Sequence, residues 1–96
     1  MNTKNILMEL RKFRDDRQQE YGIEAMGIFG SYSRGEAHPD SDVDVVVKLN
    51  KQDLFIMIGI KQDLEEVLHL PVDLVSYRPQ MDDFLKKRID RDALYV

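Results

Sequence analysis

The spacing of apolar and polar residues along the chain follows the two regular periods of protein secondary structure. Apolar residues three and four positions apart predict amphipathic helices over residues 4–20 and 80–93. Short apolar or β-branched runs predict buried strands at residues 23–29, 42–49 and 72–77. The order of these elements predicts an α/β (α+β) fold, in which helices pack on a small mixed β-sheet.

The remaining segments are less regular. Residues 51–70 predict a helix, but residues 54–60 are apolar on almost every side, so helix and strand both stay open there. This run is more typical of core than of interface, and it is the best candidate for a dimer or partner contact. Residues 30–41 are polar and rich in Gly, Ser and Pro, which indicates a loop with room for one helical turn. The charged residues within 86–92 predict a solvated helix face.

Composition narrows the class of protein. With 96 residues, 43% hydrophobic and 33% charged, the chain is expected to form a single globular domain over residues 1–96. No apolar run is long enough to cross a bilayer, so no membrane partner is expected. The absence of Cys excludes disulfides and thiolate metal sites and favours a cytoplasmic location. A net charge of −4 argues against extended nucleic acid as the ligand, but it leaves room for one nucleotide.

Three carboxylates are placed unusually for strand residues. Asp42 and Asp44 share one face of the predicted strand 42–49, because alternate residues of a strand point the same way. Like charges on one face repel unless a cation or solvent relieves them, and carboxylates suit hard cations such as Mg²⁺. The alternative is that Asp42 only begins the strand and Asp44 lies on a wet face. Asp73 joins them if the apolar strand 72–77 lies beside 42–49, and one of the three could then accept a proton from an attacking hydroxyl.

The loop before these aspartates has phosphate-binding character. Gly30 and Ser31 directly follow the strand 23–29, where exposed N–H groups and a hydroxyl can hold phosphate oxygens. Arg34 has two interpretations. It either reaches a phosphate or forms a structural ion pair with Asp40 or Glu36.

Together these residues resemble the signature of the nucleotidyltransferase fold superfamily, whose best-known member is DNA polymerase beta. That signature is Gly-Ser, ten further residues, Asp-x-Asp, and a carboxylate on a later strand. The matching residues are Gly30, Ser31, Asp42, Asp44 and Asp73. A closer variant, Gly-Ser-x-x-Arg-Gly with Ser-Asp-x-Asp, is also met, by Arg34, Gly35 and Ser41. The resemblance covers almost the whole chain and leaves no room for the additional helical domain of larger members.

The chain looks like the minimal nucleotidyltransferases, which are commonly antitoxins paired with a HEPN-domain toxin. The resemblance implies a protein adenylyltransferase that transfers AMP from ATP to a tyrosine of its toxin. It implies two Mg²⁺ ions held by Asp42, Asp44 and Asp73, with Asp73 also accepting the proton of the acceptor hydroxyl. Gly30 and Ser31 would bind the β- and γ-phosphates. The expected partner is the cognate HEPN toxin, in a hetero-oligomer, with a homodimer as the other assembly considered.

Other functions remain open at this point. The chain could neutralise a toxin by contact alone, although idle carboxylates on apolar strands are costly to keep. A small-molecule nucleotidyltransferase is disfavoured because such enzymes usually carry a further domain to hold the acceptor. Nucleotide addition to RNA ends is disfavoured by the acidic balance of the chain.

Overall fold

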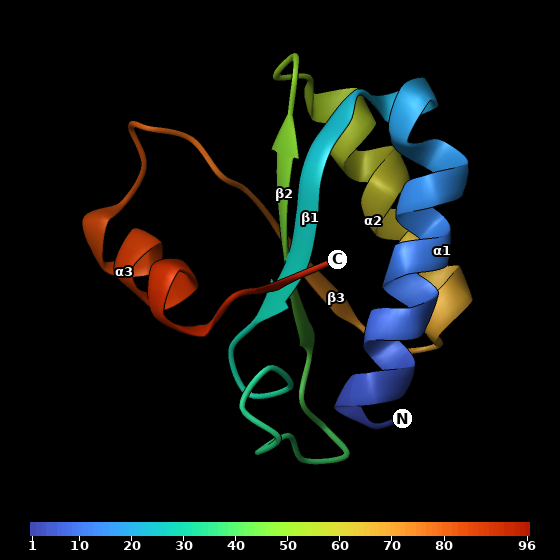
Figure 1. Ribbon diagram of the computed structural model, residues 1–96, viewed down its shortest axis with the longest axis vertical. Helices are drawn as coiled ribbons and strands as arrows, with labels where there is room; N and C mark the ends of the chain where they lie inside the picture. Colours follow the sequence, from blue (N-terminus) through green and yellow to red (C-terminus); the bar gives the residue numbers. More distant parts are fainter.

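The computed structural model describes residues 1–96 and contains three helices and four strands (Figure 1). The sheet has the order β3-β2-β1-β4, in which β2 and β3 are parallel and the other neighbours are antiparallel. The predicted small mixed sheet packed by helices is therefore confirmed. No helix is both long and apolar enough to cross a membrane. In chain order the elements are α1 (Thr3–Tyr21), β1 (Ile23–Phe29), β2 (Val43–Leu49), α2 (Leu54–Leu68), β3 (Val72–Ser76), α3 (Asp83–Asp92) and β4 (Leu94–Tyr95).

Local capping fixes where the helices begin and end. The Asn2 side chain accepts a hydrogen bond from the N–H of Asn5 and begins α1, and Gly22 ends it in the left-handed region at φ 67°. The Asp53 carboxylate accepts hydrogen bonds from the first N–H groups of α2. This cap resolves the ambiguous run at residues 54–60 as helix, because it satisfies donors that a strand would have to pair elsewhere.

The two faces of the sheet are covered unequally. Helices α1 and α2 pack on one face, where they enclose a cluster of 15 buried residues (Figure 1). The two helices are joined by a hydrogen bond of 2.6 Å from the Tyr21 hydroxyl to Asp63. This layer supplies most of the buried apolar surface, which is the main driving force of folding.

The opposite face carries only α3 and a cluster of three buried residues, Phe29, Val46 and Ile89. The solvated face predicted for residues 86–92 is wrong in part, because Arg88 is only half-exposed and the Asp92 side chain is 5% exposed. The Arg88 guanidinium lies over the ring of Phe29 instead. The charged residues of α3 thus take part in packing on this face.

The chain finishes as a short strand that the sequence pattern does not predict. The helix expected over residues 80–93 ends at Asp92, and β4 then pairs with β1, with Tyr95 opposite Gly27. A Cβ on Gly27 would lie 2.5 Å from the carbonyl oxygen of Leu94. The absence of a side chain at Gly27 therefore permits the close approach of β4.

Candidate active site

The parallel pairing of β2 and β3 brings two of the three candidate carboxylates side by side. Asp44 and Asp73 are Cα partners in this ladder, so their side chains share one face of the sheet. Asp42 directly precedes β2, which begins at Val43, and alternation places it towards the same face. Asp42 and Asp73 are exposed, and Asp44 is half-buried. The expectation that the third strand lies beside the second is thus confirmed.

The end of β1 presses against the central carboxylate. Phe29 is the register partner of Asp44 on the side away from Asp73, and Gly30 follows at φ 73°. A Cβ at Gly30 would lie 3.1 Å from Asp44 Cγ and closer still to its Oδ2. Only glycine combines this left-handed conformation with room for the carboxylate. The Asp44 carboxylate therefore occupies the space that a side chain at residue 30 would need.

The pKa of Asp44 is raised above its ordinary value by this environment. Burial is the largest cause, and the negative charges of Asp73 and Asp42 add to it. The positive charges of Arg88 and Arg34 act in the opposite direction. Burial and the neighbouring carboxylates thus both disfavour the charged form of Asp44.

Beyond Gly30 the loop forms overlapping tight turns over residues 30–36. The Gly30 carbonyl accepts hydrogen bonds from the N–H of Ser33 at 3.1 Å and of Arg34 at 3.3 Å, and from the Ser33 hydroxyl at 2.7 Å. The N–H groups of Ser31 and Tyr32 donate to no other group of the chain. A turn of this kind leaves amide donors free at its start, as phosphate-binding turns do.

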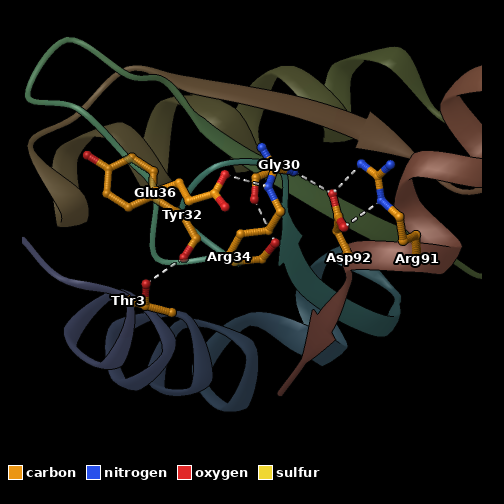
Figure 2. A network of polar contacts seen from close by, with 8 residues as sticks. Thr3, Gly30, Tyr32, Arg34, Glu36, Arg91 and Asp92 are labelled. Atoms are coloured by element: carbon orange, nitrogen blue, oxygen red, sulfur yellow. Dashed lines mark hydrogen bonds and ion pairs between the residues drawn. The ribbon is translucent and has the colours of Figure 1, made fainter.

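Two contacts attach the turn to the two helical layers of the protein (Figure 2). The Thr3 hydroxyl of α1 donates to the Tyr32 carbonyl. The Arg34 guanidinium donates to Asp92 of α3 at 2.6 Å and to Glu36 at 3.1 Å. Arg34 thus forms the ion pair with Glu36 that its alternative interpretation expects, together with one to Asp92 in place of Asp40.

Asp92 is a residue of this network that the sequence analysis missed. Its carboxylate also accepts hydrogen bonds from Arg91 at 2.8 and 3.0 Å. These contacts with Arg91, and then those with Arg34, lower the pKa of Asp92 to about 2 against the opposing effect of burial. Its distance of 58 residues from Arg34 along the chain leaves no local signal that could pair the two.

The three carboxylates offer the oxygen ligands that Mg²⁺ prefers, but their side chains are not gathered around one metal position. Oxygen ligands on one face and the mutual repulsion at Asp44 both favour a hard divalent cation. In this structure, however, no group of three or more His, Cys, Asp or Glu side chains is close enough to hold a metal ion. The side chains of Asp42 and Asp73 would have to turn inwards when a cation binds, as their exposed positions allow.

Comparison with known proteins assigns the family. Residues 10–96 match the model of the nucleotidyltransferase domain. The chain belongs to this family. This nucleotidyltransferase domain is also 35% identical over 88 residues to the protein adenylyltransferase MntA of Thermococcus cleftensis, across 91% of this chain and 88% of that one. The resemblance stated from the sequence motifs is confirmed.

Solved structures support the same assignment. A structure assigned to the minimal nucleotidyltransferases has a TM-score of 0.79 at 29% identity and covers 98% of this chain and 95% of that one. A toxin–antitoxin structure with AMP-PNP has a TM-score of 0.73 at 26% identity, covering 99% of this nucleotidyltransferase domain and 72% of that chain. A Shewanella oneidensis complex of an AMPylated HEPN toxin with its MNT antitoxin shares the fold, with a TM-score of 0.62 at 23% identity, across 98% of this chain and 67% of that one.

Proposed function

We propose that this nucleotidyltransferase domain is a Mg²⁺-dependent protein adenylyltransferase, which transfers AMP from ATP to a tyrosine hydroxyl of a HEPN toxin and so acts as its antitoxin. The observation that carries the proposal is the placement of Asp44 beside Asp73, directly against the Gly30 turn with its free amides. The name of the Thermococcus relative supports a protein acceptor, and the AMP-PNP in the similar toxin–antitoxin structure supports ATP as donor.

The reaction assigns different tasks to the two sides of Asp44. A bond forms between the tyrosine oxygen and the α-phosphorus, the bond to the α–β bridging oxygen breaks, and pyrophosphate leaves. Asp73, on the β3 side, would accept the proton of the tyrosine hydroxyl. On the β1 side, the N–H groups of Ser31 and Tyr32 and the Ser31 hydroxyl would bind the β- and γ-phosphates.

Asp42, Asp44 and Asp73 are the residues that would hold Mg²⁺. When bound, the metal would neutralise negative charge on the triphosphate as pyrophosphate leaves. A cation would also oppose the burial and the neighbouring carboxylate charges that raise the pKa of Asp44. We place the reaction in the cytoplasm, since the donor is ATP and the chain has no Cys.

The test is transfer of label to the purified toxin. The chain is incubated with a HEPN toxin encoded beside it, Mg²⁺ and ATP labelled on either the α- or the γ-phosphate. We expect label from the α-phosphate alone, and mass spectrometry should find AMP on tyrosine. Asp44→Asn and Asp73→Asn should abolish transfer, whereas Asp40→Asn should not, because Asp40 is an exposed residue of the same loop that forms no hydrogen bond or ion pair.

Other results would favour other functions. If the native chain transfers no label but still neutralises the toxin, and Asp44→Asn with Asp73→Asn neutralises equally well, the chain acts by binding alone. If label appears on a small hydroxyl compound but not on the toxin, the acceptor has been assigned wrongly. Either result would overturn the proposal while leaving the family assignment unchanged.

A further inference from the structure

Arg88 is held at the candidate active site although no sequence motif includes it. It lies on the side of α3 that faces the sheet, between two fixed neighbours. Ile89 is fully buried against Phe29 and Val46, and Asp92, one helical turn further on, is tied to Arg34. The Arg88 guanidinium lies 5.7 Å from the centroid of the Phe29 ring. These contacts fix its position without using its hydrogen-bond donors.

The charge of Arg88 has no partner within the chain. Arg34 and Arg91 are both paired with Asp92, whereas Arg88 forms no hydrogen bond or ion pair with any residue. A half-buried guanidinium with five unused donors is suited to planar, bidentate recognition of a phosphate. Because Phe29 is the register partner of Asp44, the guanidinium lies beside the candidate site.

The location of Arg88 determines which part of a bound nucleotide it can reach. Asp44 lies between Asp73, its register partner on β3, and Phe29, its register partner on β1. Arg88 lies over Phe29, on the same side of Asp44 as the Gly30 turn with its free amides. The opposite side of Asp44, where Asp73 lies, is left for the acceptor hydroxyl.

We propose that Arg88 binds the β- and γ-phosphates of the nucleoside triphosphate and stays in contact with pyrophosphate as it leaves. This inference rests on the proposed function, because it needs a triphosphate at the Gly30 turn. It assigns the phosphate-binding arginine to α3, while Arg34 holds the turn to that helix. The structure thus separates the arginine that shapes the loop from the arginine that is free to bind substrate.

The test compares nucleotides that differ in their phosphates. Affinity for AMP-PNP and for AMP, both with Mg²⁺, is measured by calorimetry for the wild type, Arg88→Gln and Arg88→Lys. Loss of a charge-assisted contact should weaken AMP-PNP binding by ~10–100-fold in Arg88→Gln. AMP binding should not change, and Arg88→Lys should be intermediate. Lys87→Gln is the matched control, because Lys87 is the exposed neighbour on the same helix and should bind both nucleotides as the wild type does.

Several results would overturn the inference. Arg88→Gln could bind AMP-PNP normally, it could lose AMP and AMP-PNP equally, or the wild type could fail to bind AMP-PNP. If Arg88→Gln fails to fold, as judged by its melting temperature, the smaller change in Arg88→Lys decides the question. The assay contains no toxin. A wild type that binds AMP-PNP through Arg88 but modifies no toxin would therefore contradict the proposed function and support this inference.

Discussion

Replacing Gly30 with Ala should separate the contact with Asp44 from the backbone strain of the turn. Gly30 and Gly35 have almost the same left-handed conformation, at φ 73° and 70°. A Cβ at Gly35 meets nothing within 4 Å, whereas one at Gly30 lies 3.1 Å from Asp44 Cγ and 3.4 Å from Asp44 Cβ. Gly30→Ala and Gly35→Ala should therefore introduce the same backbone strain, but only Gly30→Ala should also place a Cβ against Asp44.

The two effects have different magnitudes and different readouts. A non-glycine residue in the left-handed region costs roughly 1 kcal/mol, which lowers the melting temperature of a domain of this size by about 4–8 °C. Both variants should lose at least that much. Carbon atoms pack best at about 3.5–4.0 Å, and the Asp44 oxygen is closer than its carbons, so Gly30→Ala must displace the carboxylate. A displacement approaching 1 Å at a reacting centre can reduce turnover by about 100-fold.

The assay is initial-rate transfer of AMP to the toxin, with melting curves recorded for the same protein samples. Gly30→Ala should lose about 100-fold in rate, and Gly35→Ala should stay near the wild-type rate at a temperature where both are folded. Equal losses of rate in the two variants would mean that strain in the turn, and not contact with Asp44, limits activity. A fully active Gly30→Ala would refute the reasoning altogether.

Three further predictions concern stability. The arginine partners of Asp92 lower its pKa to about 2, so its charge stabilises the folded state above the unfolded-state pKa, and this contribution is lost as the pH falls towards 2. Asp92→Asn should therefore melt at a lower temperature than the wild type at pH 7, and the difference should shrink in acid. A difference in melting temperature that does not depend on pH would contradict this prediction. Ile89→Ala, which empties the centre of the α3 contact, should cost about 2–4 kcal/mol in urea unfolding, and a change below about 1 kcal/mol would show that α3 contributes little. His69→Gly should raise the melting temperature slightly, because His69 ends α2 at φ 55°, and a lower melting temperature would indicate an unrecognised role for its side chain.

The sequence predicts the central part of the fold well because the central elements bury most of their surface. The β-branched run at residues 43–49 and the helical spacing of α1 are sufficient to assign both elements. Strand β4 escapes prediction because two residues carry no detectable alternation, and its conformation depends on long-range pairing with Gly27 and Ile28 of β1. Likewise, the apolar residues at 54–60 become assignable only once the Asp53 cap is seen.

Some residues of the candidate site could likewise be predicted from the sequence, and others could not. The motif residues Gly30, Asp44 and Asp73 could be chosen from the sequence, because carboxylates on apolar strands are costly without a purpose and the Gly-Ser spacing resembles the family signature. The register that pairs Asp44 with Asp73 depends on long-range strand pairing, which local pattern does not encode. Arg88 could not be distinguished from its charged neighbours, since its position depends on how α3 docks on Phe29.

The location of Asp73 on an outer strand has a consequence for handling the protein. Strand β3 is an edge of the sheet, so the outer side of its backbone has no strand partner, although the Val72 N–H donates to Glu65 of α2. Charged residues on edge strands hinder this kind of self-association, and Asp73 is the exposed charge within β3. The same carboxylate therefore protects the protein from edge-to-edge aggregation. Inactivating it with an apolar residue would expose an uninterrupted β-prone edge, whereas asparagine removes the charge but keeps the segment polar.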